Sequence, residues 1–478
     1  AGPGGAGHSQ TILAQLERTN LFVTSLDDER LWYRYHHLFA DLLQSILRQR
    51  RSDEQIRELH WKASRWHESE GNLEEAMSHA IAAEDFERAA EMIDENIVSM
   101  LTRSEAPVLL GWIDKLPEQV TRGRHWIGIF RAYTLALSGR PAEADRLVDD
   151  VEQRIDPATP RSGEYLGHIA AIRSYTANLW DDTDRVIEMA ALANQHLPAE
   201  HLIARGMTGY ALACTYFAED DMESAVKTSL KMLDIGKKLD SLLMIVTALC
   251  DLGSMSKVQG RLRQAQEYYD TARQWLVKKN GLDSRVRAAH EVGWADSLLQ
   301  SNQLEGAHEH ALTGIDFCKR FQVPSEMVWG YVTLMRVLLA WGDVEGALNT
   351  LRDAEQVLRT HHVRQALRVE LETKRVGLWL ALNDIPAARR YAAHCDGGSE
   401  REQLALAQLS IAEERPRVAQ LVLERERTLA EGGGSYGRLF AILGTLGVAL
   451  VGLKRRVAAD AGLGGALGWG RPVGVVGV

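Results

Sequence analysis

Small residues recur along this chain in a fixed relation: a small or polar residue at a turn is followed five positions later by a small apolar one. Each turn lies between two stretches whose apolar residues repeat at helical spacing, so each is expected to join two helices. These turns run from Gly139 to Ala144, Asp181 to Val186, Asp220 to Ala225, Gly260 to Ala265, Asn302 to Ala307, Gly342 to Ala347 and Asn383 to Ala388. The pattern predicts a series of helical hairpins.

The hairpins repeat with a nearly constant period. The second residues of the seven turns are 42, 39, 40, 42, 40 and 41 residues apart. This period exceeds the 34 residues of a standard tetratricopeptide repeat (TPR) and overlaps HEAT spacing, but the turn signature favours TPR-like hairpins. A single hairpin cannot bury its own apolar face, so the hairpins must stack. The predicted fold class is therefore all-α, with a TPR-like α-solenoid over residues 121–430.

The turns also predict how the helices end. Glycine or asparagine suits a left-handed residue after the first helix, and Asp220 and Asp343 are expected to cap the helices that follow. Two earlier turns, from Gly71 to Ala76 and from Glu84 to Ala89, are only 13 residues apart and do not fit the period. We therefore assign residues 48–120 to a distinct helical adaptor.

The first 47 residues follow another pattern. A short helix begins after Ser9, and the apolar runs 21–26 and 31–35 flank Asp27-Asp28, as expected for a β-hairpin followed by a helix. This order is typical of the end of a winged-helix fold. We assign residues 1–47 to a partial winged-helix segment.

These residues carry a family resemblance. The segments Leu16-Glu17, Asn20-Leu21-Phe22, Leu26-Asp27-Asp28 and the run from Trp32 to Phe39 resemble the large ATP-dependent LuxR-type transcriptional activators, among them the maltose-regulon activator. The resemblance is specific over residues 9–145 and architectural beyond them. It implies a regulator built from a nucleotide-binding domain, a winged-helix piece, a TPR superhelix that senses an inducer, and a carboxy-terminal helix-turn-helix.

Only the middle of that arrangement is expected in this sequence. No GxxxxGK[ST] loop is present, so no cofactor is expected here and ATP would bind only in a nucleotide-binding domain outside this sequence. DNA contact is likewise expected only through a carboxy-terminal domain not contained in it. Residues 431–478 are rich in glycine, and we expect a poorly ordered or atypical tail.

Composition and charge limit the classes of molecule that this chain is expected to bind. A formal charge of −10 argues against a surface for nucleic acid or anionic lipid. Four widely spaced cysteines fit neither a zinc site nor a disulfide framework, which favours the cytoplasm. The longest apolar run, residues 439–453, contains three glycines and is too short to span a membrane.

Candidate chemistry is confined to binding. No nucleophile is paired with a base and no histidine pair has metal-ligand spacing, so we expect neither an enzyme nor a metal site. Aligning the repeats on the TPR pattern places aromatic, acidic and basic residues on the usual ligand-binding groove: Trp126, Tyr133, Tyr175, Asp296, Trp329 and Arg336. Such a mixture suits a polar ligand, for instance a sugar. Alternatively, Tyr133, Tyr175 and Trp329 belong to the core between repeats.

Two functions follow from these patterns. The first is the effector-binding portion of a LuxR-type transcriptional activator, in which a small-molecule inducer or partner protein binds the superhelix and controls self-association of the complete protein. The second is a TPR-type scaffold that binds proteins without an inducer.

Overall fold

In a computed structural model of the chain, the described residues are 16, 23–25, 33–102, 106–361, 363–395, 397, 399–433 and 436–452. They form two compact units, one of residues 1–97 and 107–127 and the other of residues 98–106 and 128–478. Among the described residues no helix is long and apolar enough to cross a membrane.

The first unit contains a short hairpin and a run of helices. Val23 pairs with Tyr35 and Ser25 with Tyr33 in two antiparallel strands that lie inside the two expected apolar runs. Ser9 and its expected helix start lie outside the described residues. The elements lying wholly or mostly in this unit are β1 (Val23–Ser25), β2 (Tyr33–Tyr35), α2 (His37–Arg50), α3 (Asp53–Ser69), α4 (Leu73–Ala82), α5 (Phe86–Thr102), α6 (Ala106–Ile113) and α7 (Glu118–Arg122).

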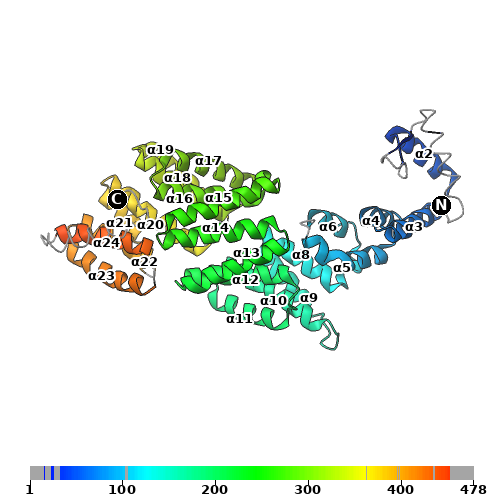
Figure 1. Cartoon of the computed structure of the whole chain (residues 1–478), viewed down its shortest axis with the longest axis horizontal. Coiled ribbons are helices and arrows are strands. Elements are labelled where there is room, and N and C mark those ends of the chain that lie inside the picture. Colours follow the sequence, from blue (N-terminus) through cyan, green and yellow to red (C-terminus); the bar gives the residue numbers. More distant parts are fainter. Residues whose placement is uncertain are drawn as a thin grey trace. The chain divides into compact units, whose positions relative to one another are not determined.

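The second unit is a stack of helical hairpins, and Figure 1 shows α14 to α19 side by side in it. The all-α, TPR-like fold class is confirmed by this architecture. Its elements are α8 (His125–Leu137), α9 (Pro141–Glu152), α10 (Ser162–Leu179), α11 (Thr183–His196), α12 (Leu202–Ala218), α13 (Met222–Lys238), α14 (Leu242–Val258), α15 (Leu262–Lys278), η1 (Gly281–Asp283), α16 (Arg285–Gln300), α17 (Leu304–Phe321), α18 (Pro324–Ala340), α19 (Val344–Thr360), α20 (Gln365–Ala381), α21 (Ile385–Ala392), α22 (Glu400–Ala412), α23 (Pro416–Gly433) and α24 (Tyr436–Gly452).

All seven predicted turn residues adopt the left-handed backbone conformation. Their φ angles lie between 55° and 79°, and the small apolar residues five positions later are at most 1% exposed. Asp343 caps the next helix by accepting a hydrogen bond from the Gly346 backbone N–H, as predicted. The prediction for Asp220 is wrong: Asp220 itself takes the left-handed conformation, and the neighbouring Asp221 accepts the N–H of Ser224.

The two helices of each hairpin are buried differently. In the first helix α10, six consecutive residues from Gly167 to Ile172 are buried, whereas the second helix α11 buries only Val186, Ala190 and Ala193. First helices also contact one another along the stack, from α10 to α12 and from α14 through α16 to α18. First helices therefore pack on neighbours all round, while second helices keep a face in solvent.

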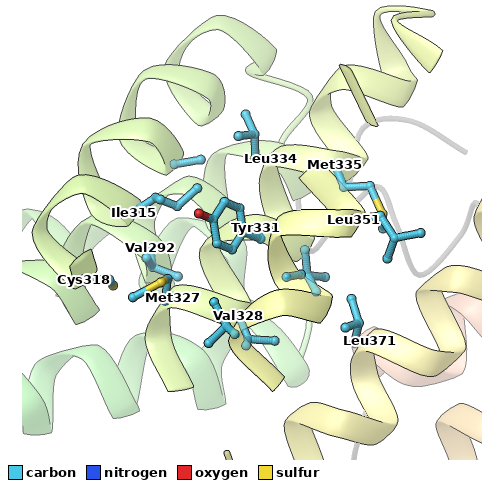
Figure 2. Packing of buried hydrophobic residues seen from close by; sticks show 14 of the residues in the cluster. Val292, Ile315, Cys318, Met327, Val328, Tyr331, Leu334, Met335, Leu351 and Leu371 are labelled. Carbon is cyan, nitrogen blue, oxygen red and sulfur yellow. The ribbon is translucent and has the colours of Figure 1, made fainter. Parts of the chain in front are cut away.

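One core cluster shows how the layers join. Val292 of α16, Ile315 of α17, Tyr331 of α18 and Leu351 of α19 meet in it, and the ring of Tyr331 lies among the aliphatic side chains (Figure 2). Leu371 of α20 closes the cluster against the next hairpin. Burying apolar surface in this way contributes about 25 cal/mol per Å².

The described chain ends within the glycine-rich segment 431–478. Residues 436–452 form helix α24, which buries Leu439, Ile442 and Leu446 against α22 and α23. In this helix the apolar spacing outweighs the intrinsic cost of glycine, and the expectation of a poorly ordered or atypical tail over residues 431–478 stays a prediction. Residues 453–478 lie outside the described part. α24 also contacts α14, so widely separated hairpins meet.

Candidate functional site

A buried ion-pair cluster links three successive first helices. Lys257 of α14 lies 2.6 Å from an Asp296 carboxylate oxygen on α16, and Arg336 of α18 donates to the other oxygen at 2.9 Å. Lys257 and Asp296 are 4% and 5% exposed. The Lys257 ammonium also lies 5.2 Å from the ring centre of Trp329. We call Lys257, Asp296, Arg336 and Trp329 the paired cluster.

Charge compensation explains how Asp296 is tolerated in the interior. Burial alone would raise the pKa of this carboxyl, but Lys257 and Arg336 together hold the pKa well below its usual value. Lys257 keeps a raised pKa because the charge of Asp296 outweighs its burial. The Asp296 carboxyl and the Lys257 ammonium are thus charged at neutral pH, and Asp296 has both carboxylate oxygens bonded.

Close packing fixes the position of the paired cluster. The ring of Tyr269, fully buried on α15, lies between Gly253 of α14 and Gly293 of α16. A Cβ atom at either glycine would lie 2.8 Å or 2.7 Å from that ring. The Lys257 ammonium is 5.9 Å from the same ring centre. The helices approach closely only because both positions lack a side chain.

Beyond the paired cluster, acidic and basic side chains alternate on the next first helices of the stack. On α20, one carboxylate oxygen of Glu370 lies 3.5 Å from the Lys374 ammonium, and the other lies 2.5 Å from the guanidinium of Arg401 on α22. The charges of Arg336 and Asp296 both act on these groups. Five successive first helices, α14 to α22, are therefore joined by a line of compensated charges.

A second polar group lies on the first helices α10, α12, α14 and α18, and its acids have no ion pair like that of Asp296 among the described residues. Its rings are Tyr175 of α10 and Tyr210 of α12, with centroids 5.8 Å apart, and its acids are Asp251 of α14 and Glu326 of α18. Cys214 lies beside Tyr210 and raises the pKa of that hydroxyl, whereas burial is the main cause of the raised pKa of the Cys214 thiol. We call these five residues the open cluster.

The two carboxyls of the open cluster have no ion-pair partner among the described residues. Asp251 Oδ2 is shielded from solvent without a hydrogen bond. Burial raises the pKa of Asp251 to about 7, against an opposing effect of Arg364, and burial also raises the pKa of Glu326. Asp251 is therefore near its midpoint of ionisation at neutral pH.

A long-range contact assembles this group. Asp181, at the turn between α10 and α11, accepts Arg364 Nε–H at 3.2 Å and the backbone N–H of Gln365 at 2.6 Å. Gln365 begins α20, whose own N-cap residue makes no side-chain cap. Asp181 thus caps a helix 184 positions away, and it neutralises Arg364 at the same time.

Tyr133 belongs to a third, separate chain of hydrogen bonds. Its hydroxyl lies 2.8 Å from His168 Nδ1, His168 Nε2 lies 2.8 Å from His201 Nδ1, and His201 lies 3.1 Å from Glu164. Burial and the neighbouring His201 lower the pKa of His168 to about 3, so this histidine is neutral. Trp126 is buried in the part of α8 that belongs to the first unit.

The residues predicted to line one groove therefore lie in several separate places. Asp296, Trp329 and Arg336 come together around Lys257, whereas Tyr175 lies in the open cluster and Tyr133 in the histidine chain. Sequence reasoning missed Lys257, Tyr210 and Asp251. In the TPR alignment, Cys214 and Ser254 occupy the same groove position in their repeats as Tyr133 and Tyr175 do in theirs. Lys257 and Asp251 are each three positions from Ser254, and Tyr210 is four from Cys214. The i, i+3 and i, i+4 relation on a helix face was the signal that could have found them.

The described residues contain no group of histidine, cysteine, aspartate or glutamate side chains arranged to hold a metal ion. None of the four cysteines forms a disulfide. The chemistry of both clusters is thus that of charge, hydrogen bonding and aromatic contact.

Comparison with known proteins agrees with this architecture. The family model of the MalT-like TPR region matches residues 167–476, and that of the MalT winged helix domain matches residues 4–55. The match beyond residue 145 shows that the resemblance there is more than architectural.

Relatives share parts of the chain. The serine/threonine-protein kinase PknK of Mycobacterium tuberculosis is 30% identical over 154 residues, which are 32% of this chain and 14% of the kinase, and PknK of Mycobacterium bovis matches equally. Among solved structures, a Rap protein complexed with competence and sporulation factor has a TM-score of 0.57 at 12% identity, covering 73% of this chain and 98% of Rap. Its likeness concerns the fold alone. Because the TPR model matches more than half of its residues, the chain belongs to the family of proteins with a MalT-like TPR region.

Proposed function

We propose that this chain is the effector-sensing portion of a MalT-like transcriptional regulator that works in the cytoplasm. The observation that carries the proposal is the presence of both a MalT winged helix match and a MalT-like TPR match in one chain. An effector would bind the superhelix and alter the state of the complete protein. The matched families and the Rap neighbour are regulatory and repeat folds, which favours binding over catalysis.

The long-range contacts suggest how binding could be transmitted. Asp181 joins the second hairpin of the superhelix to the start of α20, and α24 contacts α14. A ligand that binds more tightly to one arrangement of these contacts than to another shifts the equilibrium between the two arrangements by its difference in affinity for them. In the complete regulator this shift would control self-association, and DNA would be bound by another domain.

A protein partner is the second candidate. The Rap protein, similar in fold, was solved in complex with competence and sporulation factor, and TPR arrays commonly bind polypeptides. In that case the superhelix would act as a scaffold or be regulated by a partner protein without a small-molecule inducer.

Thermal melting against a library of small metabolites tests the proposal. A sensor gains stability as RT ln(1 + [L]/Kd), so a ligand at a hundred times its Kd adds about 2.7 kcal/mol and raises the melting temperature. A saturable one-site ligand that also changes the sedimentation coefficient of the complete protein supports the proposal. No response to any metabolite, together with one-to-one binding of a defined protein, would support the scaffold instead.

A further inference from the structure

Three histidines stack in the hairpin of α3 and α4, outside both clusters described above. His60 and His67 are seven residues apart on α3, so they lie two turns apart on one face of that helix. His79 of α4 lies against both of them. Its ring centre is 5.1 Å from that of His60 and 5.4 Å from that of His67. We call these three residues the histidine stack.

The histidine stack forms part of the contact between the two helices. His60 Nδ1 lies 2.8 Å from His79 Nδ1, and the rings of His67 and His79 are stacked at an interplanar angle of 17°. Between the two histidines of α3, the buried Ser64 hydroxyl donates to the Ala76 carbonyl at 2.8 Å. His67 Nδ1 is shielded from solvent and has no hydrogen bond. A change in the charge of these rings therefore acts directly on the packing of α3 against α4.

The geometry of the histidine stack limits the number of protons that it can hold. A neutral imidazole has one N–H donor and one acceptor nitrogen, so a single proton makes the bond between His60 and His79. An imidazolium has two donors. If both rings were charged, two N–H groups would face each other across this contact, the bond would be lost and the charges would repel. Burial and the neighbouring His60 and His67 lower the pKa of His79 accordingly.

The acids around the histidine stack do little to balance an added proton. Glu75, one turn before His79, is exposed and favours the protonated ring less strongly than burial and the two histidines oppose it. The last turn of α2, which contacts α3, carries Arg48 and Arg50. Other acids of α3 and α5 and of the turn between α4 and α5 are already paired with cations: Glu58 with Lys62, Glu84 with Arg57, and Glu68, Glu91 and Glu95 with Arg88.

A histidine contact in the superhelix shows what the histidine stack lacks. His168 Nε2 and His201 Nδ1 also lie 2.8 Å apart, but His201 Nε2 lies 3.1 Å from a carboxylate oxygen of Glu164. That carboxylate can balance a charge on His201 without breaking the contact with His168. Within the described part of the chain, none of the three stacked histidines has such an ion pair.

We propose that the histidine stack is an acid-sensitive switch, which loosens the hairpin of α3 and α4 when the pH falls below about 6.5. The folded state binds the proton on His79 less tightly than the unfolded state does. The contribution of the stack to stability is therefore complete above about pH 6.5 and is lost as the pH falls below it. The inference goes beyond effector sensing and does not depend on it.

The position of the hairpin gives this switch a regulatory meaning. α3 begins at the end of the segment that matches the MalT winged helix domain, residues 4–55, and α4 lies before the MalT-like TPR match, residues 167–476. Acid would thus loosen a segment through which these two parts of the chain are connected.

Hydrogen–deuterium exchange of the full chain at about pH 7.5 and about pH 5.5 tests the proposal, with exchange times scaled for the intrinsic effect of pH on amide exchange. Amides of α3 and α4 should lose protection about three- to tenfold at the lower pH, because one unit of pKa corresponds to a factor of ten and the rings are partly exposed. The hairpin of α12 and α13, whose helices contain no histidine, is the internal control and should keep its protection.

Matched variants assign the acid response to the histidine stack. His79→Gln removes the ring that lies against both His60 and His67, so exchange in α3 and α4 should become nearly independent of pH. The comparison is a ratio between two pH values, so a general loss of stability in the variant does not imitate this result. His308→Gln replaces a histidine whose ring packs on Trp341, and it should leave the acid response of α3 and α4 intact.

NMR titration of the histidine rings in the wild-type chain gives a second readout, with His79→Gln used for assignment. The His79 ring should titrate below the ordinary histidine value of 6.5. A His79 ring that titrates at or above that value overturns the proposal. Equal losses of protection in the two hairpins, or an acid response of α3 and α4 that persists in His79→Gln, overturn it as well.

Discussion

Asp251 and Asp296 are aspartates on contacting first helices of the same superhelix, and their surroundings are opposite. Asp296 has a lysine and an arginine on its two oxygens, whereas Asp251 has one oxygen shielded from water without a partner. Burial acts on both, but compensation lowers the pKa of Asp296 while the pKa of Asp251 rises to about 7. Burial alone therefore does not set the pKa of a carboxyl in this superhelix; the presence of a charged partner on its oxygens decides the direction of the shift.

The largest effect is expected where the paired cluster loses its acid. Asp296→Asn leaves Lys257 buried without a countercharge, and breaking a buried pair in this way costs about 3–5 kcal/mol. Urea unfolding of the variant and wild type measures the difference. Asp234→Asn is the control, because its pair with Lys238 is about 60% exposed on both sides and is worth at most about 1 kcal/mol. A loss below about 1 kcal/mol for Asp296→Asn would mean that the cluster is not structural.

The packing that holds the paired cluster in place is tested by a glycine pair. Gly293→Ala would place a Cβ 2.7 Å from the Tyr269 ring, which Gly253 confines from the other side, so we expect a loss of about 1–3 kcal/mol. Gly377→Ala on α20 meets no atom within 4 Å. It should gain up to about 1 kcal/mol, because alanine is the better helix former. Equal signs for the two variants in thermal melting would contradict the packing.

The contact that assembles the open cluster is expected to have a moderate effect. Asp181→Gly keeps the left-handed backbone but removes the acceptor of Arg364 and Gln365, and losing a helix cap costs about 1–2 kcal/mol. Amide hydrogen exchange at the start of α20 should become faster. Asn302→Gly is the matched control at the same turn position, and it should leave exchange in α20 unchanged. Unaltered exchange in both variants would rule out the long-range cap.

The smallest effect depends on pH and concerns the open cluster. The folded pKa of Asp251, about 7, lies above its ordinary value of 3.8, so the folded state binds the proton more tightly. Wild type therefore loses stability as pH rises from about 4 through 7, and Asp251→Asn does not. Allowing for its partial exposure, we expect the variant to gain about 1 kcal/mol more at pH 8 than at pH 5 in urea unfolding. A gain independent of pH would contradict the raised pKa.

Much of the fold could be predicted from the sequence because its determinants are local. A left-handed residue followed five positions later by alanine or valine marks each hairpin. One further turn with this spacing, from Glu414 to Ala419, lies outside the predicted series because it falls short of the period. The Ser64 hydroxyl bonds the Ala76 carbonyl as Ser174 bonds that of Val186, so α3 and α4 form the same kind of hairpin despite their irregular spacing.

The candidate sites were less predictable because they depend on contacts between hairpins that are far apart in the sequence. Asp296, Trp329 and Arg336 could be selected one repeat at a time, but their shared partner Lys257 lies three positions from the aligned residue. Nothing in the local sequence places Asp181 at the start of α20, since the two are 184 residues apart. Whether a carboxylate finds a partner is decided by such contacts.

Asp251 has an oxygen without a hydrogen-bond partner, whereas both oxygens of Asp296 are bonded to cations, and the two carboxyls should therefore titrate far apart. Carboxyl ¹³C NMR of aspartate-labelled protein, with Asp251→Asn and Asp296→Asn used for assignment, measures both titrations directly. We expect a resonance that titrates near pH 7 and disappears in Asp251→Asn, and an Asp296 carboxyl that stays ionised down to at least about pH 4. An Asp251 carboxyl that titrates below about pH 5 would show that it has a partner in solution and would contradict the account.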